Sequence, residues 1–249
     1  MNWVKNSLAP KKINTLNEKS LHAALKRWYR KPGDRLEVPL DGYVIDLVRK
    51  GLLVEIQTAN FSAIRHKLEA LLECHPVRLV YPIEREKWLI KLPKSKGEKE
   101  TRRKSPKRGR VEGVFAELVY FPRLMRHPNF SLEVLLIQGE EVRHFDARRA
   151  WRRKGWVTEE RRLLKVVDRT LFETPLDLQA LIPEGLSEPF TTLELAQTLA
   201  APRRLAQQMA YCLRKMEALA IQGKRGNAWL YARTSRARAA GLGKDEHRG

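Results

Sequence analysis

The chain has 249 residues, enough for one large domain or for two to three smaller ones. Hydrophobic residues make up 43% of the chain, which allows a buried core and excludes a wholly disordered protein. The formal net charge of +20 indicates a polyanionic partner, because so much like charge repels itself in a compact structure. Nucleic acid is the expected polyanion.

Two sequence features argue against a membrane or secreted protein. No apolar run of about 18 residues could span a bilayer, and residues 1–16 are polar and lack the apolar region of a signal peptide. Cys74 and Cys212 are isolated, so they predict neither a disulfide framework nor a zinc site. Together these features predict a cytoplasmic protein with no membrane partner.

Residues 1–92 are predicted to form the first domain. Apolar periodicity predicts helices over residues 17–30 and 61–73, and strands over residues 35–40, 43–49, 52–58 and 77–83, with residues 87–92 as a candidate for one more strand. Asp41-Gly42 and Lys50-Gly51 separate the first three strands, and each is a two-residue hairpin turn signal.

Residues 93–110 are predicted to be a basic linker. The segment has no apolar side chain beyond its proline and glycine punctuation, so it cannot bury a core. Its basic residues, set against only two glutamates, are Lys94, Lys96, Lys99, Arg102, Arg103, Lys104, Lys107, Arg108 and Arg110. The segment is either a solvated tether or an arm that lies along phosphates and releases their counterions.

Residues 111–174 are predicted to form a middle α+β region, with a helix over residues 113–125 and a strand over residues 132–137. Arg152 and Arg153 lie between Trp151 and Trp156. Bases stack on tryptophan while arginines hold the backbone, so this stretch is a candidate nucleic-acid contact. The alternative is that both tryptophans belong to the edge of the core.

Residues 175–233 have the order of a winged helix-turn-helix. Thr191 and Glu194 form a capping box before a short helix, and a second helix is expected over residues 203–219. A hairpin with a turn over residues 223–227 follows as the wing. The expected DNA-binding residues are Arg203, Arg204, Gln207, Gln208, Tyr211, Arg214, Lys215, Lys224 and Arg225. The alternative is a winged helix that serves in dimerisation, and residues 234–249 form a basic tail.

The chemistry is predicted from the register of the hairpin at Lys50-Gly51. A two-residue turn there places Leu47 opposite Val54 and Asp46 opposite Glu55. Gln57 shares the face of Glu55, because side chains alternate with a period of two. The other face is expected to carry the four apolar side chains of Ile45, Leu47, Val54 and Ile56.

Two facing carboxylates repel each other, and a divalent cation removes that repulsion. Mg²⁺ prefers oxygen ligands, and it polarises a phosphodiester and activates water. Asp46 and Glu55 are therefore the candidate ligands of Mg²⁺ or Mn²⁺. The alternative is that one carboxylate is neutralised by a basic residue, for which the candidates are Arg49, Arg65 and Lys67.

The order of elements, with Asp46 on the second strand and Glu55-Ile56-Gln57 on the third, resembles the PD-(D/E)XK restriction-endonuclease-like superfamily. The resemblance covers residues 17–83. It implies an α/β fold with an αβββαβ core, in which Asp46 and Glu55 bind the metal and Glu18 of the first helix assists. Gln57 stands where a lysine is usual, and Lys67 or Arg65 of the next helix is a candidate for the missing cation.

The first functional hypothesis is therefore a Mg²⁺-dependent DNA endonuclease that is directed to DNA by the winged helix. Gln57 in place of lysine favours a second hypothesis, a DNA-binding protein or regulator whose nuclease-like domain has lost its activity. A third hypothesis is an RNA-binding protein, which the arginine-rich stretch around Trp151 would suit. The sequence leaves the oligomeric state open, including a homodimer.

Overall fold

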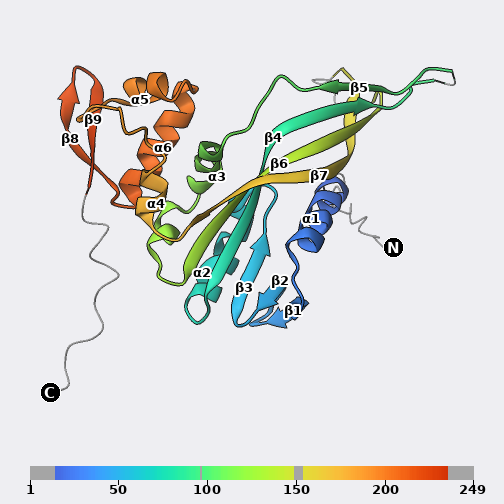
Figure 1. Ribbon diagram of the computed structural model, residues 1–249, viewed down its shortest axis with the longest axis horizontal. Coiled ribbons are helices and arrows are strands. Elements are labelled where there is room, and N and C mark those ends of the chain that lie inside the picture. The colour runs from blue at the N-terminus through green and yellow to red at the C-terminus, as the bar shows by residue number, and fades with distance from the viewer. Residues whose placement is uncertain (1–14, 96, 149–153, 235–249) are drawn as a thin grey trace, which may run out of the picture.

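The computed structural model describes residues 15–95, 97–148 and 154–234, with side chains from residue 20 onward. It is a mixed α/β structure built on one large mixed sheet, with helices on both faces and a helical region at the C-terminal end (Figure 1). Within these residues, every helix is too short or too polar to cross a bilayer.

The elements follow in chain order. The helices are α1 (Thr15–Tyr29), α2 (Phe61–Leu72), α3 (Phe115–Leu118), α4 (Pro175–Gln179), α5 (Thr192–Thr198) and α6 (Arg203–Lys215), with 3₁₀ turns η1 (Val111–Val114) and η2 (Pro122–Arg126). The strands are β1 (Arg35–Leu40), β2 (Tyr43–Arg49), β3 (Leu52–Ile56), β4 (Val77–Lys91), β5 (Thr101–Lys104), β6 (Phe130–Phe145), β7 (Trp156–Phe172), β8 (Leu219–Arg225) and β9 (Ala228–Arg233).

The two predicted hairpins are confirmed. Asp41-Gly42 joins β1 to β2, and Lys50-Gly51 joins β2 to β3, with antiparallel pairing on both sides of each turn. All four turn residues have positive φ, between 47° and 86°, which is the conformation that two-residue hairpin turns require. The predicted order of helix, three strands, helix and strand is also found, with β3 and β4 parallel.

Strand β4 is the centre of the large sheet, whose order is β1-β2-β3-β4-β6-β7. One edge of β4 pairs with β6 from Val77 to Lys91. The other edge is shared, because β3 pairs with residues 77–80 and β5 pairs with residues 88–91. The predicted division of this segment into two strands is wrong, since β4 runs unbroken to Lys91. Among the described residues, no strand pairs with the part of this shared edge between Val80 and Trp88.

The predicted linker is not a tether over its whole length. Residues 101–104 form β5, and Gly109 N donates a hydrogen bond to Glu84 O at 2.9 Å, so the segment returns along β4. Its cations also find partners, because Arg102 Nε lies 2.9 Å from Glu140 and Lys104 Nζ lies 2.7 Å from Glu86. The prediction missed these contacts because they depend on acidic residues of distant strands.

The predicted boundary between the first domain and the middle region is also wrong for the sheet. Strands β6 and β7 belong to the same sheet as β1 to β4, and β6 is longer than the predicted strand over residues 132–137. Strand β7 was not predicted, and the helix expected over residues 113–125 is broken into η1, α3 and η2. Pairing between strands so far apart in sequence leaves no local periodic signal.

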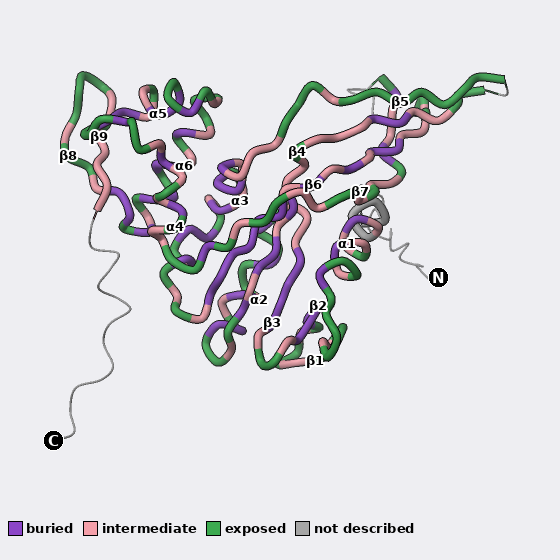
Figure 2. The backbone as a smooth tube through the Cα atoms, viewed as in Figure 1, coloured by how far each residue is buried: buried purple, intermediate pink, exposed green. Residues whose placement is uncertain are grey.

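The two faces of the sheet carry different helices. Leu21 and Leu25 of α1 pack with Val54, Ile56 and other residues in one buried cluster. Helix α2 packs with residues of β3, β4 and β6 in a second and larger cluster on the opposite face. Figure 2 shows the buried backbone concentrated where these layers meet, while the outer ends of the long strands are more exposed.

The C-terminal helices and the β8–β9 hairpin share the larger core. Buried residues of α5 and α6, such as Leu195 and Met209, belong to the same cluster as Phe115 and Phe130. The capping box at Thr191 and Glu194 is present, with Glu194 N donating to Thr191 Oγ1 at 3.2 Å. The second helix ends at Lys215, earlier than the predicted residue 219, and Leu219 is instead the first residue of β8.

We expect Gly109→Ala to destabilise the return of the arm onto β4. A Cβ at position 109 would lie 2.5 Å from Glu84 O, and the clash is with backbone rather than with a flexible side chain. The free energy of unfolding should fall by about 1–3 kcal/mol, as measured by urea denaturation. The control is Gly185→Ala, where a Cβ meets nothing within 4 Å. Equal stability of the two variants would contradict the close approach.

Candidate functional site

The site lies where β2 and β3 separate. Their ladder runs from Arg49 opposite Leu52 to Leu47 opposite Val54, as predicted. Beyond it, Asp46 Oδ2 accepts a hydrogen bond from the backbone N–H of Ile56 at 2.9 Å, so a side chain replaces a backbone acceptor. Strand β3 stays with β4, because Gln57 N donates to Val80 O at 2.9 Å. The separation leaves room for a cavity.

The prediction that Asp46 and Glu55 share a face opposite four apolar side chains is wrong. Leu47, Val54 and Ile56 do pack together under α1, but Ile45 packs in the cluster that contains α2. The alternation of β2 therefore breaks at Asp46. On β1, Glu37 lies between the residues paired with Ile45 and Leu47, and its φ of 50° marks the same irregularity.

Asp46 is neutralised from the side of α1. His22 Nε2 lies 2.9 Å from Asp46 Oδ2, and Lys26 Nζ lies 3.0 Å from Asp46 Oδ1. Only 14% of the Asp46 side chain is exposed, and burial opposes its ionisation. The hydrogen bonds from His22, Ile56 N and Lys26 outweigh burial and lower the pKa of Asp46 to about 2. Asp46 is therefore a half-buried carboxylate that is ionised at neutral pH.

Glu55 is neutralised from the side of α2. It is 4% exposed, and Lys67 Nζ lies 2.6 Å from Glu55 Oε1 and donates to Val44 O at 2.7 Å. Burial raises the pKa of Glu55, Lys67 lowers it, and the negative charge of Asp46 raises it. The net direction is upward. The two carboxylates thus differ in opposite directions from their ordinary pKa values.

The alternative counter-charges that the sequence offered have other partners. Arg49 pairs with Asp34 at 2.7 Å, and Arg65 pairs with Glu69 at 2.8 Å. Lys67 is the cation of α2 that reaches Glu55. His22 and Lys26 were missed by sequence reasoning, although with position 18 they follow a spacing of four residues along α1, which places all three on one side of the helix.

Gln57 holds less of the site than predicted. Gln57 Nε2 donates to the backbone oxygens of Ala59 at 2.5 Å and Asn60 at 3.3 Å, so its amide nitrogen secures the loop after β3. Position 18 lies in α1, but the Glu18 side chain is outside the described part of the structure. Gln57 still lines the cavity.

A cavity of about 580 Å³ connects these groups. Its volume is within the ~300–1,000 Å³ range of pockets that hold small ligands. The walls come from α1, from the three hairpin strands and from α2, and they include His22, Lys26, Glu37, Asp46, Glu55, Gln57 and Lys67. The two carboxylates therefore face one space, even though they are neutralised from opposite faces of the sheet.

The oxygen donors that line the cavity are of the type that a hard cation prefers. The carboxylates of Glu37, Asp46 and Glu55 and the carboxamide of Gln57 line one cavity. Mg²⁺ typically takes one or two carboxylates and completes its shell with water and phosphate oxygens. Within the described residues, no group of three or more His, Cys, Asp or Glu side chains converges as a preformed cage. A cation would therefore compete with Lys26 and Lys67 for the carboxylate oxygens.

The C-terminal candidates lie around a second concave surface. Arg203, Gln207, Tyr211 and Arg214 of α6 line a cavity of about 240 Å³ with residues of the β8–β9 hairpin, among them Trp229. Lys224 Nζ lies 4.2 Å from the ring centroid of Trp229, and Arg225 pairs with Glu194 at 2.7 Å. Arg204 is exposed on the same helix, and Gln208 and Lys215 are half-buried. Arg152 and Arg153 lie outside the described residues.

Comparison with known proteins places this site inside a recognised family region. Residues 19–173 match the family described as "Domain of unknown function (DUF8091)". The chain is 34% identical over 187 residues to an uncharacterised protein of Treponema pallidum (strain Nichols), which covers 75% of this chain and 74% of that protein. No solved structure matches the chain. The family region includes the cavity and the large sheet, and it ends before the C-terminal helices.

The pKa of Asp46 predicts a pH-dependent contribution to stability. Because the folded value of about 2 lies below the ordinary 3.8, the carboxylate stabilises the fold above pH 3.8, and this contribution is lost as the pH falls through 2. We expect Asp46→Asn to lower the free energy of unfolding by about 2 kcal/mol at neutral pH. Urea denaturation at several pH values measures this.

The difference between wild type and Asp46→Asn should shrink as the pH falls from about 5 to about 2. The control is Asp41→Asn, an exposed turn residue whose side chain pairs with His75 at 3.0 Å. A difference that stays constant across this pH range would show that Asp46 does not stabilise the fold through its charge.

Proposed function

Since the chain belongs to the DUF8091 family, whose description assigns no activity, we propose its function from the site: it hydrolyses phosphodiester bonds of DNA with Mg²⁺ or Mn²⁺. The observation that carries the proposal is the single cavity lined by Asp46, Glu55, Gln57 and Lys67 at the end of the β2–β3 ladder. The element order and the parallel pairing of β3 with β4 support a nuclease-like core.

Each residue has a role in this proposal. Asp46 and Glu55 would hold the metal ion, which supplies Lewis-acid activation of the phosphodiester and of water. Lys67 supplies the positive charge that a lysine at position 57 would usually provide, because its amino group already lies 2.6 Å from Glu55 Oε1. With Glu55 held as a metal ligand, Lys67 would be free to donate to a phosphate oxygen. Gln57 keeps the loop after β3 in position.

The C-terminal region would bring DNA to the protein as a winged helix, with α6 as the recognition helix and the β8–β9 hairpin as the wing. Arg203 and Arg204 stand in the first turn of α6, where the helix dipole disfavours positive charge. These cations do not stabilise the helix, which supports a role in binding phosphate groups. The exposed side chains of Gln207 and Arg214 suit contact with base edges.

A second candidate function is DNA binding without cleavage. It is favoured by the internal neutralisation of both carboxylates and by Gln57, whose amide nitrogen is bonded to the loop. The RNA-binding hypothesis depends on the stretch around Trp151, which lies outside the described residues. Cleavage assays separate the first two candidates.

We expect purified protein to cut plasmid or branched DNA with Mg²⁺ or Mn²⁺ and not with EDTA. Asp46→Asn, Glu55→Gln and Lys67→Met should each lower the rate by at least about 100-fold, measured by gel electrophoresis. The matched control is Arg65→Met on the same helix, because Arg65 pairs with Glu69 at the exposed surface. Its rate should equal that of wild type.

Metal-dependent cleavage that survives both Asp46→Asn and Glu55→Gln would refute the assigned site. Absence of cleavage with either metal, together with tight and salt-sensitive DNA binding, would favour the second candidate.

We expect Arg214→Ala to weaken duplex DNA binding about tenfold and to lower the salt dependence by about one phosphate contact. Arg214 is exposed on α6 and lines the cavity shared with the hairpin. Fluorescence anisotropy across salt concentrations measures both effects. Arg123→Ala removes the same charge from exposed η2 and is the control. Equal losses in the two variants would argue against a recognition role for α6.

A further inference from the structure

A second cavity lies at the unpaired edge of β4. Strand β3 accompanies β4 only to Val80, and the returning arm rejoins it at Glu84 through the hydrogen bond from Gly109. Pro82 stands in the gap, where its lack of an N–H leaves no donor unpaired. The cavity in this gap has a volume of about 430 Å³ and is lined by residues of α1, β4, β6, β7, the loop after β3 and the arm.

The cavity has an apolar floor and a cationic rim. Leu21, Ile83 and Ile137 supply apolar side chains, and Tyr81 supplies an aromatic ring. Burial raises the pKa of Tyr81 to about 12, so its hydroxyl remains a hydrogen-bond donor at neutral pH. The rim carries four basic side chains, those of Lys87, Lys107, Arg108 and Arg161, against the single carboxylate of Glu84.

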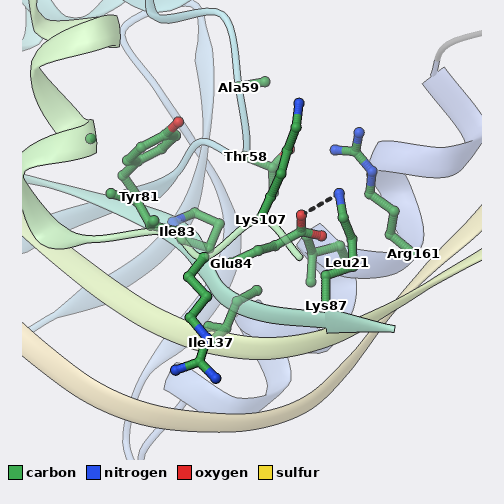
Figure 3. Close-up of a pocket in the computed structure, with 14 residues that line it drawn as sticks. Leu21, Thr58, Ala59, Tyr81, Ile83, Glu84, Lys87, Lys107, Ile137 and Arg161 are labelled. Atoms are coloured by element: carbon green, nitrogen blue, oxygen red, sulfur yellow. Dashed lines mark ion pairs between the residues drawn. The ribbon is translucent and has the colours of Figure 1, made fainter. Parts of the chain in front are cut away.

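Two of these cations are not neutralised by any residue that the structure describes. Lys87 is neutralised, because its amino group lies 2.7 Å from Glu84 and 3.0 Å from Glu141. In the part of the chain that the structure describes, Lys107 and Arg161 form no ion pair, and the buried Nε of Arg161 has no hydrogen-bond partner. In Figure 3, the amino group of Lys107 and the guanidinium of Arg161 both extend above the Glu84–Lys87 pair.

An unpaired buried donor costs free energy unless an acceptor reaches it. The acceptor that matches Arg161 and Lys107 is a phosphate oxygen, because arginine and lysine together suit a monoanionic or dianionic phosphate group. The apolar and aromatic floor beside them suits a flat, weakly polar group. A phosphate joined to a base has both properties.

The second cavity adjoins the carboxylate site. Thr58 lines both cavities, and the loop that separates them is secured by the hydrogen bonds of Gln57 to Ala59 and Asn60. A strand that places one phosphodiester at Asp46 and Glu55 could therefore continue past Thr58 into the second cavity.

We propose that this cavity binds one unpaired nucleotide of a DNA strand, with its base on the apolar floor and its phosphate on Lys107 and Arg161. A base that is paired and stacked in a duplex is not available to such a cavity, so the preferred substrate has a single-stranded segment. The position of this nucleotide beside the bond that is cut rests on the proposed nuclease function. The binding itself does not.

The test is the affinity of the full chain for a fluorescein-labelled oligothymidylate in EDTA, measured by fluorescence anisotropy. We expect Lys107→Ala and Arg161→Ala each to weaken binding about fivefold and to lower the salt slope by about 0.7. Ala59→Leu, which fills the cavity without changing charge, should weaken oligothymidylate binding and leave duplex binding unchanged. The charge-matched control is Arg162→Ala, because Arg162 is exposed on β7 and pairs with Glu160 at 2.7 Å.

Equal losses in Arg161→Ala and Arg162→Ala would overturn the proposal, as would an Ala59→Leu variant that binds oligothymidylate like wild type. Thermal denaturation of each variant shows whether a loss reflects unfolding, and binding is then compared at a temperature where every variant is folded. Oligothymidylate binding that responds as expected without any cleavage would support the cavity and refute the nuclease proposal. Cleavage that depends on Asp46 but is unchanged in the cavity variants would support the nuclease proposal and refute nucleotide binding in the second cavity.

Discussion

The shared edge of β4 is the constraint on which the rest of the structure depends. One edge of β4 is fully paired with β6, while the other is paired with β3 at its start and with β5 at its end. Strand β3 is short, so the sheet opens after Val80. The loop after β3, the returning arm and α1 then surround the opening. The gap in the ladder thus sets the position of the second cavity, whereas the separation of β2 from β3 sets that of the carboxylate cavity.

The carboxylate site shows how a sheet can hold two carboxylates that are largely shielded from solvent. Each carboxylate is neutralised by a helix on its own side, Asp46 by α1 and Glu55 by Lys67 of α2. Local hydrogen bonds lower the pKa of Asp46, whereas burial raises that of Glu55. Two neighbouring carboxylates with opposite pKa shifts are typical of functional sites. Lysine counter-charges leave such a site stable without a cation.

The C-terminal helices are joined to the sheet rather than tethered beside it. Their buried side chains belong to the same cluster as Phe115 and Phe130, and Arg126 pairs with Glu217 across the junction at 2.6 Å. Arg110, at the end of the returning arm, donates to Leu199 O at 2.7 Å. Under the proposed function, DNA held by α6 would therefore lie at a fixed position relative to the sheet.

Much of the local structure could be read from the sequence. Two-residue turns at Asp41-Gly42 and Lys50-Gly51 have only one good hairpin geometry, and Thr191 with Glu194 satisfies the first N–H groups of α5 within a few residues. Lys67 was a correct candidate for the cation near Glu55. The turn and cap predictions succeed because the interactions that decide them lie within a few residues of the chain.

The orientation of Asp46 shows what local patterns miss. A period of two assigned it to the face of Glu55, but the irregularity shared with Glu37 of β1 turned it toward α1. His22 and Lys26 became partners of Asp46 only when α1 packed on the sheet.

The sequence by itself determined the short-range elements, the positive charge and the identity of the two carboxylates. Only the tertiary structure decided that residues on both sides of the basic arm form one sheet, which helix neutralises which carboxylate and where the cavities lie. The physical reason is that strand pairing and ion pairing join residues far apart in the chain, and side-chain packing selects among partners that a local pattern cannot distinguish.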